Sequence, residues 1–192
     1  MSEFSEGYFL KTKDTQEASQ LLKNSNLEGY ISEEVHNDWV LILPNKEAFE
    51  SCSEIIENNK GILLHYQYAD DHGFFFALYQ GNQAVSYYED SYDEMSYNNN
   101  NLNLDVLAST LNFSSEDIIK IKKLFKDVSK AFEDCEELED EEFEKSYELI
   151  QSLRSKFMEI LKISPYAYKW VSYHYASLED DGIEIKLKKI IS

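Results

Sequence analysis

Three short runs of apolar and aromatic residues in the middle of the chain constrain its fold more than any other feature. They cover residues 62–68, 74–79 and 84–88, and two turn sequences, 70–73 and 81–82, separate them. Short turns that contain Asp, Asn and Gly join consecutive antiparallel strands as hairpins. The segment therefore predicts three antiparallel strands joined by two tight turns.

The residues before this segment alternate between strand and helix patterns. Asp14 and Asn45 each precede a helical pattern and are suited to cap it, because a short polar side chain accepts hydrogen bonds from the first helical N–H groups. The resulting order, β-α-β-β-α-β, predicts an α+β fold: a ferredoxin-like antiparallel sheet with a β-hairpin extension. The predicted strands are 7–12, 29–33 and 38–43, and the predicted helices are 14–25 and 46–58.

Helical spacing dominates the second half of the chain. Apolar residues recur at three- and four-residue intervals over 104–111, 118–128 and 143–161. Pro165 is suited to the first turn of a further helix, whose apolar residues run to Leu178 and which Asp181-Gly182 ends. Residues 183–191 alternate only in part, so a final strand and a short helix both fit them.

Four consecutive asparagines at 98–101 separate the two halves. Asparagine favours neither a helix nor a strand, and no apolar side chain anchors this segment. We therefore predict a ferredoxin-like domain over 1–97, an Asn-rich linker over 98–101 and a mainly helical C-terminal region over 102–192.

A strong negative charge limits the partners that the chain can bind. It has 37 acidic and 18 basic residues, a formal charge of −19, and 43% hydrophobic residues, which is too apolar for a disordered acidic tail. Phosphate binding depends on clustered Lys and Arg, so this charge argues against direct nucleic-acid binding and against an anionic membrane surface. No signal-peptide pattern and no membrane-spanning apolar run are present, which predicts a cytoplasmic protein.

The motifs of common enzymes and cofactor sites are absent from the sequence. There is no phosphate-binding GxxxxGK[ST], no dinucleotide-binding GxGxxG, and no HExxH or GxSxG. The two cysteines, Cys52 and Cys135, have neither zinc spacing nor a nucleophile signature. We expect no cofactor, and the absence of these motifs favours a protein without catalytic activity.

The densest cluster of acidic and aromatic residues follows the third strand of the hairpins, at 87–97. Acids complement a basic partner, and tyrosines supply rigid contact area at protein interfaces. Three interpretations stay open: a solvated loop, a partner contact and a Ca²⁺ site without the EF-hand order. The residues that we predict to contact a partner are Tyr88, Asp90, Tyr92, Asp93 and Glu94. A second acidic run, 133–144, is either solvated or attractive to a basic partner.

Two further clusters have a functional and an ordinary interpretation. His65, Asp70, Asp71 and His72 would supply a metal site or an acid–base pair, although adjacent acids are also common formers of solvated turns. Aromatic residues and His174 over 166–175 would line a ligand pocket or simply fill the core.

Two stretches resemble an uncharacterised bacterial family of small acidic α+β proteins. One is GILLHYQYADDHGFFFALYQGNQAVSYYED at 61–90, and the other is LKISPYAYKWVSYHYASLEDDG at 161–182. The resemblance implies a ferredoxin-like sheet followed by a helical tail and implies no activity. Some small acidic bacterial proteins of this general appearance are immunity proteins of toxin systems.

The sequence leads to two functional hypotheses. The first is a non-catalytic acidic protein, of immunity or inhibitor type, that masks a basic protein partner such as a toxin or a nucleic-acid-binding enzyme, or that mimics nucleic acid. The second is a small metal- or ligand-binding enzyme domain that uses the Asp and His residues of the 65–72 turn.

Overall fold

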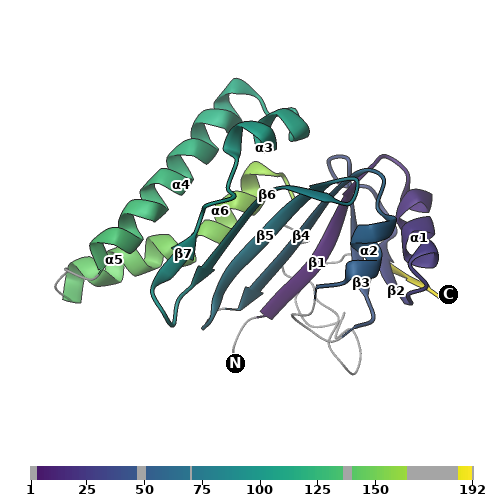
Figure 1. Ribbon diagram of the computed structural model, residues 1–192, viewed down its shortest axis with the longest axis horizontal. Coiled ribbons are helices and arrows are strands. Elements are labelled where there is room, and N and C mark those ends of the chain that lie inside the picture. Colours follow the sequence, from purple (N-terminus) through teal and green to yellow (C-terminus); the bar gives the residue numbers. More distant parts are fainter. Residues whose placement is uncertain (1–3, 47–50, 70, 136–139, 164–185, 192) are drawn as a thin grey trace.

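An eight-stranded antiparallel sheet forms the centre of the molecule, and helices lie on both of its faces (Figure 1). The structure is a computed structural model that describes residues 4–46, 51–69, 71–135, 140–163 and 186–191. The predicted α+β class and the antiparallel sheet are confirmed.

The strands follow the order β7-β6-β5-β4-β1-β3-β2-β8 across the sheet. They are β1 (Phe4–Lys11), β2 (Gly29–Ser32), β3 (Trp39–Pro44), β4 (Ile62–Ala69), β5 (Gly73–Gln80), β6 (Gln83–Ser91), β7 (Ser96–Asn98) and β8 (Leu187–Ile190). Strands β4, β5 and β6 pair consecutively through the two turns that the sequence predicts. Each is longer than predicted, because hydrogen-bonded pairing continues beyond the apolar run, to Ala69 in β4, Gln80 in β5 and Glu89 in β6.

The last strand settles an alternative that the sequence leaves open. Strand β8 pairs with β2, with Gly29 opposite Ile190, and forms one edge of the sheet. The C-terminal region is therefore helical only in part, since its end adds a strand to the sheet that the N-terminal half builds.

The described residues form six helices, and the predicted capping residue marks the start of the first one. They are α1 (Thr15–Asn24), α2 (Ser53–Asn58), α3 (Leu104–Leu111), α4 (Ser115–Cys135), α5 (Asp140–Gln151) and α6 (Leu153–Ile160). Asp14 is the N-cap of α1, as predicted, and its carboxylate accepts a hydrogen bond of 2.8 Å from the Gln16 N–H. The helix predicted after Pro165 lies outside the described residues.

Two predicted helix boundaries are wrong. Helix α2 begins at Ser53 rather than at residue 46, because the Asn45 N–H donates to the Glu28 carbonyl and so extends the β2–β3 pairing. The single stripe predicted over 143–161 is divided at Ser152, which separates α5 from α6. The apolar periodicity continues from α5 into α6, so the sequence pattern alone does not reveal the break between the two helices.

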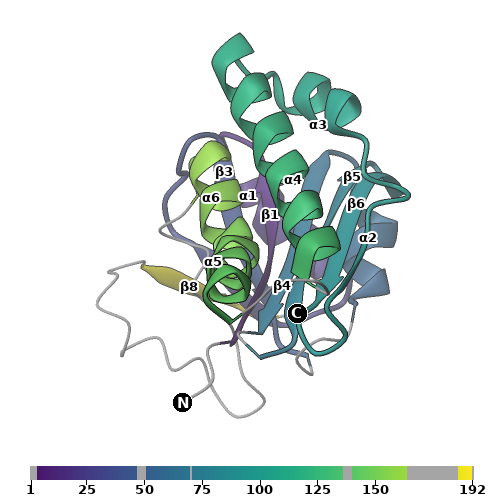
Figure 2. The same cartoon turned by 90° about the vertical axis from the view of Figure 1, so that its left-hand side faces the viewer.

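Helices lie on both faces of the sheet (Figure 2), and each face has its own hydrophobic core. Tyr8, Ile42 and Leu63 face α1 and α2, where Cys52 and Ile55 complete the smaller cluster. The larger cluster lies on the opposite face, between the sheet and helices α3–α6. Side chains alternate along a strand, so neighbouring residues such as Tyr8 and Phe9 enter different cores.

The Asn-rich connection is held against strand β6. Asn98 is the last residue of β7 and pairs with Glu89, and the Tyr87 N–H donates to the Asn101 carbonyl. Asn103 caps α3, and its own N–H donates to the Ser86 hydroxyl. The division into 1–97 and 102–192 stays a prediction, and one hydrophobic cluster contains residues from both sides of it.

Gly73 is required where β5 begins. Its φ is +141°, and a Cβ atom built there would lie 2.2 Å from the Asp90 carbonyl oxygen. We expect Gly73→Ala to lower the free energy of unfolding by more than about 2 kcal/mol, because it combines an unfavourable φ with a backbone clash. Urea denaturation measures this loss.

Gly81→Ala is the matched control. Gly81 also has a positive φ, +60°, but nothing lies within 4 Å of its added Cβ. Its cost is therefore the conformational penalty alone, roughly 1 kcal/mol. Equal losses in the two variants would contradict the close approach of Gly73 to Asp90.

Candidate functional site

Two turns meet at the end of the sheet where β4 and β6 finish. His72 lies between β4 and β5, and its Nδ1 is 2.8 Å from Asp93 Oδ2 in the β6–β7 turn. The Tyr92 N–H also donates to the His72 carbonyl, with an N–O distance of 2.9 Å. The His72 and Asp93 side chains are 65% and 64% exposed, so this contact presents polar groups to solvent.

The predicted partner-contact residues divide into two groups at this turn. Asp93 and Glu94 are exposed, whereas Tyr88, Asp90 and Tyr92 are 1%, 6% and 5% exposed. The expectation of an exposed loop is wrong for these three residues, because β6 continues to Ser91 and its alternation turns Tyr88 and Asp90 toward the helices. Direct partner contact is therefore kept as a prediction for Asp93 and Glu94.

Asp90 is a buried acid that joins two strands. Its Oδ1 accepts a 2.7 Å hydrogen bond from the Phe74 N–H. Burial raises the pKa of Asp90 to about 7, and the Phe74 N–H and the nearby Tyr88 hydroxyl lower it in part. Removing water disfavours the charged form of a carboxyl group, which explains the direction of the shift.

Tyr92 anchors the β6–β7 turn in the core. Its ring packs edge-on against Tyr147 of α5, with ring centroids 6.2 Å apart. Tyr68 lies nearby, with the Arg154 guanidinium 3.7 Å above its ring, and Arg154 also donates to the Ser5 hydroxyl. Burial raises the pKa of Tyr92, which keeps its hydroxyl neutral. The exposed acidic residues of the turn are thus supported by ordered, buried side chains.

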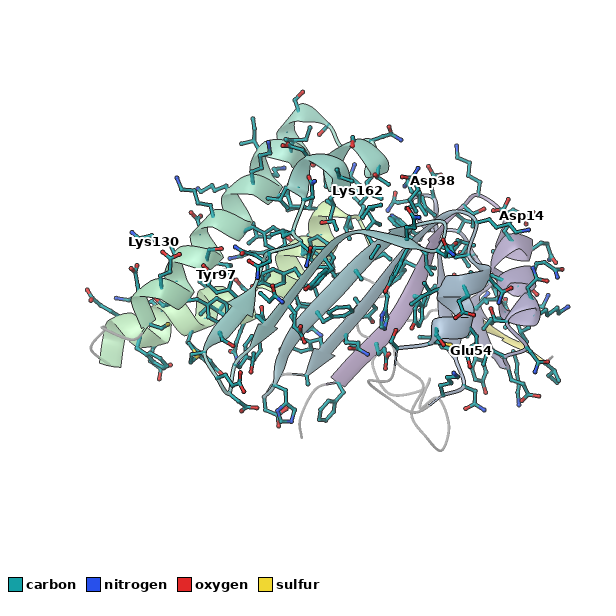
Figure 3. All side chains as sticks on the ribbon, in the orientation of Figure 1. Asp14, Asp38, Glu54, Tyr97, Lys130 and Lys162 are labelled. Carbon is teal, nitrogen blue, oxygen red and sulfur yellow. The ribbon has the colours of Figure 1, made fainter. Side chains whose placement is uncertain are left out.

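Helices α4 and α5 add more acids beside this turn (Figure 3). The Tyr97 hydroxyl donates to Glu133 Oε1 at 3.1 Å, and the Tyr97 ring contacts Phe132, which places the end of α4 against β7. Segments 89–98 and 131–151 together contain fourteen acidic residues and one basic residue, Lys145. We call this surface the acidic end and define it by the exposed residues Asp71, Asp93, Glu94, Glu133, Asp134 and Glu144.

The Asp and His residues at 65–72 do not converge on one centre. His65 is buried in β4, stacked on Tyr8 at 4.2 Å, and its Nε2 is 3.2 Å from Glu6 Oε1. His72 is exposed in the turn, and Asp70 lies outside the described residues. Within the described part of the chain, no three His, Cys, Asp or Glu side chains are placed to hold a metal ion.

Sequence reasoning missed the residues that support the acidic end. Arg154, Tyr68 and Tyr147 come from other elements and carry no motif, although Arg154 is the single arginine of the chain. The aromatic stripe at 166–175 lies outside the described residues. No helix in the described segments combines the length and the apolar composition needed to cross a membrane.

Comparisons with family models, with curated proteins and with solved structures gave no match. The function is therefore inferred from the geometry and charge of this chain.

Tyr92 provides a direct test of the buried anchor. We expect Tyr92→Ala to lower the free energy of unfolding by about 2–4 kcal/mol, because it removes a buried ring from contact with Tyr147. Tyr92→Phe should change stability by less than about 1 kcal/mol, since the hydroxyl has no hydrogen-bond partner among the described residues. Urea denaturation of both variants measures this, and a neutral Tyr92→Ala would show that the ring lies in solvent.

Asp90 should make stability depend on pH. An unfolded Asp has a pKa of about 4, so a folded pKa of about 7 means that the folded state binds the proton more tightly. Protonated Asp90 therefore contributes to the stability of the folded state. This contribution is complete at a pH below the pKa of Asp90 in the unfolded chain, and it is lost as the pH rises through the pKa of Asp90 in the folded chain. The full loss is on the order of 4 kcal/mol.

Asp90→Asn keeps the acceptor for the Phe74 N–H and removes the ionisation. Thermal unfolding from about pH 4 to about pH 8 should therefore show the variant gaining stability relative to the wild type as the pH rises. Glu94→Gln, an exposed neighbour, controls for the loss of one negative charge. Parallel pH profiles of the wild type and Asp90→Asn would contradict the assignment.

Proposed function

We propose that this protein is a non-catalytic acidic binding protein whose acidic end covers a basic surface on a protein partner. The observation that supports this most is the exposed His72–Asp93 contact, which sits on the buried Tyr92 anchor. A surface loop that buried side chains already hold in place loses less conformational freedom on binding than a free loop does.

The charge distribution supports a basic partner. Acids of one sign that are gathered on one surface raise the rate of encounter with an oppositely charged protein. Tyr97 and Glu133, joined by a hydrogen bond, add an aromatic group at the edge of the same surface. An immunity-type or inhibitor role, including mimicry of nucleic acid toward a nucleic-acid-binding enzyme, is consistent with these features.

We further propose that residues 4–69 form a ferredoxin-like unit, to which β5–β8 and α3–α6 are added. The supporting observation is the adjacent order β4-β1-β3-β2, in which all pairs are antiparallel. Helix α1 connects β1 to β2 and α2 connects β3 to β4, as a split β-α-β arrangement requires.

A cytoplasmic location is part of the same proposal. Cys52 and Cys135 are both buried free thiols. Reducing compartments keep such thiols free, which agrees with a cytoplasmic protein.

Charge neutralisation at the acidic end tests the proposed function. The triple variant Asp71→Asn, Asp93→Asn, Glu94→Gln removes three exposed negative charges. The matched control Glu17→Gln, Glu33→Gln, Glu34→Gln removes three exposed charges from α1 and the β2–β3 connection. Quantitative capture with the immobilised wild-type protein identifies the basic partner, whose association with each variant is then followed by stopped flow.

The acidic-end variant should associate several-fold more slowly than the wild type at low salt, and the control should not. The difference should shrink as salt rises, since charges more than about 8 Å apart are screened at physiological ionic strength. Equal slowing in both variants, or association that is independent of salt, would contradict the proposal.

A further inference from the structure

A cavity of about 390 Å³ lies at the opposite end of the strands from the acidic end. Lys11 at the end of β1 and Leu10, which pairs with Leu63 at the start of β4, mark that end of the sheet. Residues from the β3 start, the α3–α4 connection and the end of α6 line the cavity together with Lys11. Its size falls within the range of small-molecule sites in proteins.

Four residues with a left-handed backbone conformation line the cavity. Asn37, Asp38, Asn112 and Lys162 have φ values of +51°, +65°, +54° and +60°, and all four line the cavity. They are four of the six non-glycine residues with positive φ in the described segments. Asn112 is the C-cap of α3, Lys162 follows the C-cap of α6, and Asn37 and Asp38 form the turn between His36 and Trp39. Helix ends and a tight turn, which each favour positive φ, therefore meet at the cavity.

A long-range hydrogen bond fixes two of these residues. The Asn37 Nδ2 donates to the Lys162 carbonyl at 2.8 Å, and 125 positions separate the two residues in the chain. Asp38 and Lys162 both lie at the upper rim of the sheet in Figure 3. The cavity wall is thus held by contacts between distant segments.

Two lysines, Lys11 and Lys162, line the cavity. Within the described segments, Lys11 and Lys162 have no carboxylate at salt-bridge distance, although the chain has 37 acidic residues. The Lys11 Nζ lies 4.7 Å from the centre of the Trp39 ring. Partial burial lowers the pKa of Lys11, Asp38 opposes this, and the nearby charges of Lys13 and Lys162 lower the pKa further.

The two acids that line the cavity have other contacts. Asp38 Oδ1 is 3.9 Å from the Lys13 Nζ. Asp117 Oδ2 accepts a 2.7 Å hydrogen bond from the Ser114 hydroxyl, which in turn accepts from the Asp117 N–H at the start of α4. Both carboxylates stay negatively charged in these contacts, so an anionic ligand has to be held closer to the lysine ammonium groups than to Asp38 and Asp117.

We propose that this cavity binds a small organic anion, with its carboxylate or phosphate group held by Lys11 and Lys162 and its apolar part against Trp39 and Phe113. Seven of the twelve lining residues are polar or charged, and Trp39, Leu111, Phe113, Ile160 and Leu161 supply the apolar part of the wall. Lysine ammonium groups bind carboxylate and phosphate oxygens as point charges. The proposal is independent of the acidic end, and either one can fail without the other.

Aromatic acids and their neutral counterparts test the proposal. The probes are benzoate with benzamide, and phenyl phosphate with phenol; each pair shares a ring and differs in charge. Trp170→Phe leaves Trp39 as the single tryptophan, so Trp39 fluorescence reports binding near the cavity. Ligands of this size bind with Kd values in the range of about 0.1–10 mM.

Lysine substitutions separate charge recognition from simple hydrophobic filling. Lys11→Met keeps an unbranched stem beside Trp39, and Lys162→Asn keeps a residue that tolerates a positive φ. Each should raise the Kd of the preferred acid by about tenfold or more, as the loss of a charged hydrogen bond does. Lys23→Met, an exposed lysine in the last turn of α1, should leave the Kd unchanged.

The proposal is supported if benzoate, phenyl phosphate or both bind saturably to the wild type, if the neutral counterparts bind more weakly, and if the two cavity variants lose this binding. The acid that binds more tightly then shows which anionic group the site prefers. Absence of saturable binding in the folded wild type, equal binding of the neutral counterparts, or full binding by both lysine variants would overturn it. Circular dichroism confirms that each variant is folded.

Discussion

A layer of aromatic side chains between the sheet and the C-terminal helices supports both proposed sites. Phe76 of β5 stacks on Phe157 of α6 with centroids 4.4 Å apart, and Phe125 of α4 meets both Phe157 and Tyr88 edge-on. Burying such rings is among the largest favourable contributions to folding. This layer holds α4 and α6 in the positions from which they complete the acidic end and the cavity.

The two ends of the strands therefore differ in chemistry. At one end, the buried Tyr92, Asp90 and Arg154 support exposed acids that are suited to a basic protein. At the other end, Lys11 and Lys162 lie in a cavity without acidic partners among the described residues. The net charge of −19 agrees with the acidic end but gives no sign of the cavity, because a net charge does not show where the lysines lie in the structure.

The sequence predicts what local contacts determine. Asp14 caps α1, and the turns between β4, β5 and β6 form where Asp and Gly signals occur, since each depends on residues a few positions apart. The burial of Tyr92 depends on Tyr147, fifty-five positions later, and the cavity depends on four separate segments. Neither leaves a periodic pattern, so both were beyond reach from the sequence. The tetra-asparagine segment favoured a linker, but hydrogen bonds to β6 hold it in place.

The most direct test of this account is whether the sheet and the C-terminal helices unfold together. In the Trp170→Phe background, Trp39 fluorescence reports on the sheet, and far-ultraviolet circular dichroism reports mainly on α4, α5 and α6. A shared aromatic core predicts one urea transition with the same midpoint and slope by both probes. Loss of helical signal in a separate transition, before the environment of Trp39 changes, would contradict it.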